Sequence, residues 1–335
     1  MNIRKLAFGL AALAASTAFT VTNANAQRVV LGGNPQGSLL YSMSNAIGAT
    51  VTKHSNLKVD VLPQGATVFY PMMASQEVDF GMVNPMDVLA AAKGLPPYDK
   101  VTGGKGFPLQ TLMLGSPIRL SLVTSKDSGV AKLEDLKGKR VVANYGAFAS
   151  AGKTALSVLA NAGLGANDVN VVTVSSYPEG VRAVMEGRAD AAVGSIGSGI
   201  VQELDAARGA RILQIDPGSD AMGKTRKVGS AFVPMKVNKG LPGIEVDTWV
   251  IGYSIPIVAR TDLDEDTAYE FVKAVWNHYS ELKGIFRPLA TWTPDRFAST
   301  EAVLPYHPGA IKFYKEAGVW TDEMEKHQAQ LKSAM

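Results

Sequence analysis

Two stretches of this sequence repeat one pattern, ASQEVDFGMV at residues 74–83 and VMEGRADAAV at residues 184–193. Each reads as the end of a short helix, a polar turn, a small apolar residue, an aspartate and an apolar strand. An earlier apolar strand begins after Arg28 in one copy and after Arg140 in the other. From strand start to aspartate the spacing is 50 residues (79 − 29) and 49 residues (190 − 141). The sequence therefore predicts two similar β-α-β-α-β units, and two such lobes enclose a ligand cleft.

The segments around these stretches predict an α/β fold of two lobes. In the first unit we expect strands at 28–32, 57–62 and 79–83 and helices at 38–54 and 67–75. In the second we expect strands at 140–144, 169–174 and 189–194 and helices at 150–162 and 177–186. Two extended segments have the length to cross between the lobes, 109–124, interrupted at 115–117, and 249–259. Two crossings let the lobes rotate about a two-stranded hinge.

These crossings set the predicted domain limits. Residues 27–117 and 250–335 form lobe I, and residues 118–249 form lobe II. An acidic segment at 262–266 begins a helix that extends to about residue 282. Its residues Phe271, Val275 and Tyr279 recur at i, i+4 and i+8, which predicts a stripe facing the core, with Trp276 packing rather than binding.

The N-terminus reads as an export signal. Arg4 and Lys5 precede an apolar run over residues 6–21, and residues 24–26 form a small-x-small site, so we expect cleavage after Ala26 and a periplasmic protein. The alternative is a retained anchor. The remaining chain has 31 basic residues (33 − 2) and 30 acidic ones, a net charge of +1 that gives no field for nucleic acid or an anionic membrane. It has no cysteine, which excludes disulfides, thiolate metal sites and cysteine nucleophiles.

Polar residues at helix starts predict where a ligand binds. In open α/β sheets ligands lie at the carboxyl ends of strands, where the free N–H groups of helix starts attract carboxylates. Ser38 and Ser150 each follow the start of their lobe's first strand by nine residues. The repeat thus places one serine on each lobe, and each hydroxyl either contacts a ligand or only caps its helix. Thr67 and Ser176 hold similar places before the second helices.

Arg119 lies on the first crossing segment between two apolar residues. A charge in that setting needs a partner, which is either a carboxylate of the protein or the anion of a ligand, unless the side chain faces solvent. Four aromatic residues lie near the expected edges of the cleft, where each either packs in the core or lines the pocket: Tyr41, Tyr145, Phe148 and Tyr253.

Patterns for other functions are incomplete. AFASAGKT at residues 147–154 resembles a phosphate loop, but it begins with alanine where glycine is required, and strand 169–174 has no acidic residue for magnesium. GSIG at residues 194–197 is only part of a nucleophile elbow. The histidines show no metal-ligand spacing along the chain: His54, His278, His307 and His327. We therefore expect no catalytic residues, no metal and no cofactor.

Three segments carry a family resemblance: LEDLKGKRV at residues 133–141, EGRADA at residues 186–191, and HPGA at residues 307–310 leading into FYKE. With them the chain resembles the TAXI family of TRAP-transporter solute receptors, periplasmic binding proteins of the type II fold. The first two segments are shared with other type II binding proteins, and the third points to TAXI. The resemblance implies a small organic anion as ligand, often a dicarboxylate or related acid, and a TRAP-type membrane permease as partner. We expect a monomer.

The chain departs from the family at the pocket. The family's Gly-Gly-Thr-Tyr-Tyr motif stands here as QGSLL at residues 36–40, and its Gly-Ser-Gly stands as FAS at residues 148–150. The more apolar walls favour a less polar organic acid. The resemblance carries over the polar positions Ser38, Thr67, Asn84 and Ser150. The whole candidate set for ligand binding is Ser38, Leu39, Tyr41, Thr67, Asn84, Arg119, Tyr145, Ser150, Ser195 and Tyr253.

Two competing hypotheses remain. One is an ABC-importer receptor of the same fold, of the nitrate, sulfonate or pyrimidine-precursor type. The other is an enzyme on this fold, such as the pyrimidine synthases that resemble binding proteins.

Overall fold

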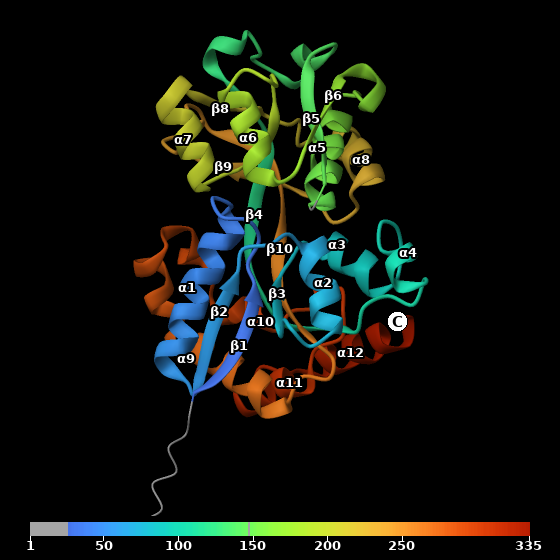
Figure 1. The fold of residues 1–335 in the computed structure, drawn as a ribbon, viewed down its shortest axis with the longest axis vertical. Coiled ribbons are helices and arrows are strands. Elements are labelled where there is room, and N and C mark those ends of the chain that lie inside the picture. Colours follow the sequence, from blue (N-terminus) through green and yellow to red (C-terminus); the bar gives the residue numbers. More distant parts are fainter. Residues whose placement is uncertain (1–25, 147) are drawn as a thin grey trace, which may run out of the picture.

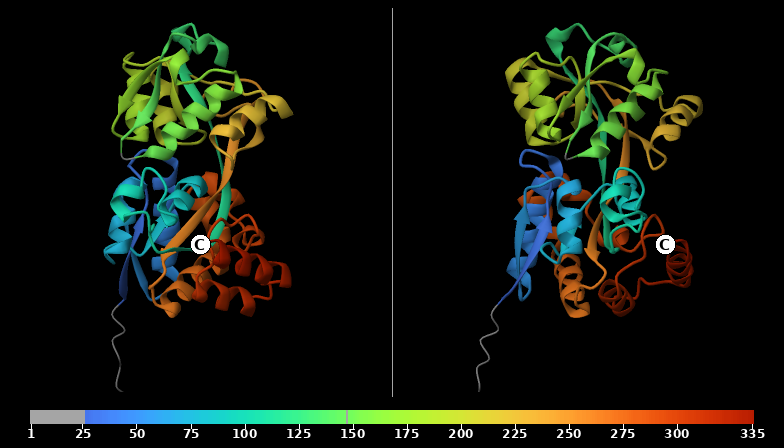
Figure 2. Two further views of the ribbon diagram at one scale, coloured as in Figure 1. Left: turned by 90° about the vertical axis from the view of Figure 1, so that its right-hand side faces the viewer. Right: turned by 45° about the vertical axis from the view of Figure 1, so that its right-hand side comes forward.

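The structure is a computed structural model that describes residues 26–146 and 148–335. Except for Ala26, the predicted signal peptide lies outside the described residues. Figure 1 shows two lobes stacked along the long axis of the molecule and joined by β4 (Leu109–Ser125) and β10 (Thr248–Arg260). Both views of Figure 2 show these two strands running together between the lobes. The expected two-lobed α/β fold with two crossing strands is confirmed.

Lobe I is built from both ends of the described chain. Its N-terminal elements are β1 (Gln27–Gly32), α1 (Leu39–His54), β2 (Leu57–Leu62), α2 (Ala66–Ala74), β3 (Phe80–Met82), α3 (Pro85–Ala92) and α4 (Asp99–Thr102). Its C-terminal elements are α9 (Glu265–Ile285), the 3₁₀ helix η4 (Arg287–Thr291), α10 (Pro294–Phe297), α11 (Pro308–Glu316) and α12 (Asp322–Ala334). Helix α3 was not predicted, although Asn84 caps it and Pro85 occupies its first turn, a common combination at helix starts.

Lobe II is one continuous stretch of chain between the crossing strands. It contains η1 (Lys126–Ser128), η2 (Leu133–Leu136), β5 (Arg140–Tyr145), α5 (Ala149–Asn161), η3 (Ala166–Asp168), β6 (Asn170–Val174), α6 (Tyr177–Met185), β7 (Ala192–Ser195), α7 (Gly199–Arg208), β8 (Ala210–Ile212), α8 (Ser219–Val228) and β9 (Val233–Val237). The predicted limits at 117/118 and 249/250 fall inside β4 and β10, and these domain limits stay a prediction.

One sheet passes through both lobes. Its strand order is β2-β1-β3-β10-β4-β7, with β8 paired to β4 and β9 paired to β10. The crossing strands pair antiparallel with each other, and their register shifts where Ser254 and Pro256 face Pro117 and Leu114. The predicted interruption at 115–117 is therefore a bulge within a strand that continues. Strands β5 and β6 form a separate parallel pair, joined to the segment before β7 by an isolated bridge at Val141 and Ala191.

The repeated aspartate has the same backbone role in both lobes. Asp79 Oδ2 accepts a hydrogen bond from Val30 N at 2.9 Å, and Asp190 Oδ2 accepts one from Arg140 N at 2.8 Å. In each copy the small apolar residue before the aspartate, Val78 or Ala189, is buried. The pattern thus fixes the first strand of each lobe beside the third.

Helix α9 departs from the predicted apolar stripe at one residue. Phe271 and Val275 are fully buried, but Tyr279 is exposed. The helix is interrupted just before Tyr279, at His278, where φ is −121° and ψ is 16°, and Leu282 in the following turn is again buried. The prediction for Tyr279 was therefore wrong. Trp276 packs on Phe297 at a ring distance of 5.8 Å, as expected of a core residue.

Among the described residues, no helix has both the length and the apolar character that a membrane crossing requires.

Candidate ligand-binding site between the lobes

A small enclosed cavity lies where both lobes meet the crossing strands. Its volume is about 20 Å³, and its walls come from both lobes and both crossing strands: Ser38, Leu39, Leu40, Ile118, Leu120, Phe148, Ser150, Ala151, Thr154, Tyr177, Val193, Ser195 and Tyr253. We call it the serine chamber. Five residues of the candidate set, Ser38, Leu39, Ser150, Ser195 and Tyr253, line it. The fold brings them together from positions far apart in the sequence.

Ser38 caps helix α1 and faces the chamber. Its Oγ accepts a hydrogen bond from Tyr41 N at 3.1 Å, which is the capping role considered from the sequence. A hydroxyl has one proton to donate besides its two acceptor lone pairs, so capping leaves the Ser38 proton available to a ligand. The residue is buried, so that a ligand acceptor would compete little with bulk water.

Ser150 occupies the equivalent place on the other lobe, in the first turn of α5. It makes no side-chain cap, and its hydroxyl has no hydrogen-bond partner among the described residues. Two helix starts, one from each lobe, therefore face one cavity. Their free N–H groups and positive dipole ends favour an anion between them.

Tyr177 is a chamber residue that the sequence reasoning missed. Its hydroxyl accepts a hydrogen bond from Ser195 N at 2.7 Å and lies 3.0 Å from Ser198 Oγ. Burial raises the pKa of Tyr177, so it stays neutral and fixes the backbone of Ser195 at the end of β7. The sequence did indicate a helix start at this place, and we singled out Ser176 there. The residue that lines the chamber is the next one, Tyr177.

Tyr253 and Asn84 meet at the crossing strands. Burial raises the pKa of Tyr253, and the neighbouring Asn84 side chain opposes that rise. Asn84 Oδ1 accepts from Met86 N at 2.8 Å, and its Nδ2 is the donor through which Asn84 acts on the Tyr253 hydroxyl. Asn84 is not among the residues that line the serine chamber, so ligand contact by Asn84 stays a prediction.

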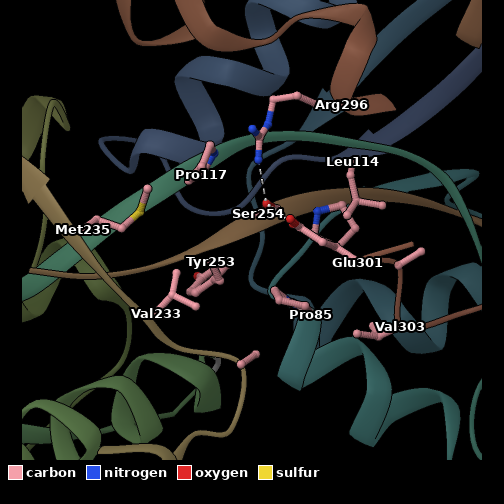
Figure 3. A pocket seen from close by; sticks show the side chains of 13 residues that line it. Pro85, Leu114, Pro117, Val233, Met235, Tyr253, Ser254, Arg296, Glu301 and Val303 are labelled. Carbon is pink, nitrogen blue, oxygen red and sulfur yellow. Dashed lines mark hydrogen bonds between the residues drawn. The ribbon is translucent and has the colours of Figure 1, made fainter. Parts of the chain in front are cut away.

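A second, larger cavity lies on the interlobe surface and shares Tyr253 with the chamber (Figure 3). Its volume is about 530 Å³, within the usual range for small-molecule sites. Most of its wall is apolar: Pro85, Leu114, Pro117, Ala231, Val233, Met235, Pro256, Ala302 and Val303. At one side Arg296 Nη2 donates to Ser254 Oγ at 3.2 Å, and Ser254 Oγ donates to Glu301 Oε2 at 2.8 Å. Arg296 has no direct ion pair within the described residues, so its charge is available to an acid group.

Arg119 does not face the serine chamber. Ile118 and Leu120 on β4 line the chamber, and successive strand residues point to opposite faces, so Arg119 points away from it. It lines a different cavity of about 560 Å³ together with Gln202 and Arg287. Burial lowers the pKa of Arg119, and over the described ranges its guanidinium has no ion pair or hydrogen bond. Contact between Arg119 and a ligand stays a prediction, at a place other than the expected one.

The other candidates lie outside both cavities. Tyr145 is buried in lobe II, where its hydroxyl accepts from Val193 N at 3.0 Å, so its contacts are those of a core residue. Tyr41 and Thr67 are partly buried and line none of the interlobe cavities described above. Ligand binding by these residues stays a prediction.

A buried carboxylate and a lysine face each other across the lobes. Asp87 on α3 and Lys153 on α5 line a cavity of about 70 Å³. Burial raises the pKa of Asp87 to about 6, opposed by the Tyr98 hydroxyl, which donates to it at 2.9 Å, and by the charge of Lys153. When Asp87 is ionised, its attraction to Lys153 draws the two lobes together.

Comparison with known proteins gives the family. The model of the NMT1-like family matches residues 31–318. This chain belongs to the NMT1-like family. Among solved structures, this NMT1-like protein is similar to PhnD1 from Prochlorococcus marinus (MIT 9301) in complex with methylphosphonate. The TM-score is 0.54 at 12% identity, over 89% of this chain and 100% of that one. It is also similar to a protein of Bordetella bronchiseptica RB50, with a TM-score of 0.50 at 15% identity over 92% and 98% of the two chains.

These likenesses confirm the two-lobed periplasmic binding protein fold for this member of the NMT1-like family. The comparisons do not confirm the narrower resemblance to TAXI receptors, which stays a prediction.

Proposed function

We propose that this chain is the solute receptor of a membrane importer and that it closes its two lobes on a small organic anion. The observation that supports this most directly is the serine chamber, where the starts of α1 and α5, with Ser38 and Ser150, face one cavity from opposite lobes. Two converging helix starts are a binding arrangement for an acid group.

The ligand enters only when the lobes separate. A volume of about 20 Å³ holds roughly one water molecule, far less than an organic acid. The lobes touch directly, since Ile200 N donates to Gly37 O at 3.4 Å across the interface. Rotation about β4 and β10 would open the chamber, and closure would then bring both helix starts onto the anion.

The residues that line the serine chamber indicate the class of ligand. A single charged hydrogen bond contributes about 1.5–3 kcal/mol, whereas micromolar affinity needs about 8 kcal/mol, so several donors and some apolar contact are required. The chamber offers serine hydroxyls beside Leu39 and Phe148, which suits a carboxylate, sulfonate or phosphonate with an apolar body. The likeness to PhnD1 with methylphosphonate supports including phosphonates in this class.

Two types of permease compete as the partner. The match to the NMT1-like family supports an ABC importer better than a TRAP transporter. The HPGA segment at residues 307–310 is the observation that favours a TRAP-type permease. Reconstitution with each permease in vesicles separates the two, because uptake that requires ATP hydrolysis identifies an ABC importer.

The ligand proposal is tested by thermal shift and calorimetry with carboxylates, amino acids, sulfonates and phosphonates. For the compound that binds, we expect Ser150→Ala to weaken affinity about tenfold to a hundredfold, because a donor to the charged group is lost. Ser157→Ala, on the same helix but bonded to Lys153 O, is the matched control and should leave affinity unchanged. If only Arg296→Gln weakens binding, the ligand lies in the larger cavity instead. Absence of binding across the whole panel would contradict the proposal.

A further inference from the structure

Two histidines that lie far apart in the sequence meet on lobe I. His54 is the last residue of α1, and His278 lies 224 residues later (278 − 54) in α9. Their rings are parallel, at an interplanar angle of 4°, with their centroids 3.5 Å apart. The pair is at the opposite end of α1 from Ser38, so it is separate from the serine chamber.

One carboxylate joins both rings. Glu281 Oε1 lies 3.1 Å from His54 Nε2 and 3.4 Å from His278 Nδ1. His278 and Glu281 are separated by three residues on one helix, a spacing that places both side chains on the same face. One ligand atom from each of the three residues falls within 4.8 Å of the other two. The distances place two imidazoles and one carboxylate around a common point.

The local backbone supports this cluster. Helix α9 has its break at His278 itself, and neither proline nor glycine stands at that position to cause it. Next to the break Tyr279 lies at the surface, while the His278 ring stacks on His54 of α1.

We propose that His54, His278 and Glu281 form a binding site for a divalent transition-metal ion of the zinc type. Two histidines and one carboxylate are a ligand set that Zn²⁺ accepts, with water completing a tetrahedron. Because the rings are parallel, their nitrogen lone pairs do not yet converge. Metal binding would therefore require a rotation of at least one ring, and both rings are partly exposed.

Lys53 occupies the place of the metal charge in the absence of an ion. Its Nζ lies 2.8 Å from Glu281 Oε2. An arriving cation would displace the ammonium group. The bound ion would then tie the end of α1 to α9, two helices that pack together in lobe I.

The test is calorimetric titration of the full metal-free chain with Zn²⁺. We expect one ion per chain, with affinity reduced at least tenfold in His54→Gln and in His278→Gln. His327→Gln is the matched control, since that ring bonds to Ala302 O elsewhere in lobe I, and it should leave affinity unchanged. Lys53→Gln should tighten binding, because the competing charge is gone, and this gain does not arise from loss of folding.

Circular dichroism of each variant separates a lost ligand from a lost fold. The proposal is overturned if Zn²⁺ does not bind, if His327→Gln weakens binding as much as His54→Gln, or if Lys53→Gln weakens it. Because the cluster lies apart from the serine chamber, none of these outcomes bears on solute binding.

Discussion

The two lobes hold their repeated aspartate with different arginines. In lobe I, Arg260 of the crossing strand β10 donates to Asp79 Oδ1 at 3.2 Å, and both side chains are only 15% exposed. In lobe II, Arg140 of the lobe's own first strand donates to Asp190 Oδ1 at 2.7 Å and is 47% exposed. The same pattern therefore ties lobe I to the hinge by a shielded ion pair, whereas in lobe II the pair stays within the lobe and nearer to water.

The turns before the two aspartates also differ. Three residues before each aspartate the backbone is left-handed, with φ of +63° at Gln76 and +74° at Gly187. Glycine adopts this conformation without penalty, whereas glutamine adopts it at a cost in free energy. In lobe I the side chain compensates, since Gln76 Nε2 donates to Asp262, which also pairs with Arg260. A repeated turn thus keeps its geometry while the residues that support it change.

The largest effect is expected for Asp79→Ala. It removes the acceptor of Val30 N and leaves Arg260 partly unpaired in a shielded position, so we expect a loss of about 2–4 kcal/mol in the free energy of unfolding. Urea denaturation measures it. Asp60→Ala is the control, because its ion pair with Arg28 is exposed and should be worth less than about 1 kcal/mol.

A smaller loss is expected for Asp190→Ala. The variant loses the acceptor of Arg140 N, but the guanidinium it releases is half exposed and is rehydrated, so we expect about 1–2 kcal/mol. The same urea experiment compares the two lobes directly. A loss greater than that of Asp79→Ala would contradict the difference in shielding.

The turn itself is tested by Gly187→Ala. A Cβ at this position meets only Arg208 Nη1, at 3.8 Å, so the cost is conformational and should be about 1 kcal/mol. Gly223→Ala in helix α8 is the control of opposite sign. There the Cβ meets nothing within 4 Å and alanine favours the helix, so stability should rise.

The smallest effect is a pH dependence in lobe II. The Arg140 guanidinium lowers the pKa of Asp190, whereas an aspartate in the unfolded chain titrates near 3.9. A depressed folded pKa gives stability that is present above the unfolded pKa and is lost as the pH falls through the folded one. The stability difference between the wild type and Asp190→Asn should therefore be constant from about pH 7 to pH 5 and narrow below about pH 4. If the stability difference between the wild type and Asp190→Asn widened in acid, the lowered pKa of Asp190 would be contradicted.

The repeat predicted the fold because its signals are local. Strand 57–62, the helix to His54 and the Ser38 cap depend on residues close in sequence, and they are found as expected. The placement of Ser38 and Ser150 on one cavity also follows from register, since equivalent helix starts face each other when similar lobes meet.

What the sequence did not predict depends on contacts between distant segments. Arg119 was placed correctly on the crossing strand, but its face depends on the pairing register of β4. The break at His278 has no proline or glycine to signal it, and so Tyr279 was assigned to the core. The meeting of His54 with His278 is set by packing of α1 on α9, which no spacing along the chain reveals.

The insertion of lobe II between the two halves of lobe I sets an order of folding. As the chain is synthesised, every element of lobe II is present once β10 has emerged. Lobe I must wait for the last quarter of the polypeptide, because Phe271 covers Phe80 at a ring distance of 4.4 Å and Tyr314 donates to Leu112 O at 2.8 Å. Strand β3, near the start of the described chain, thus lacks part of its cover until α9 has been made.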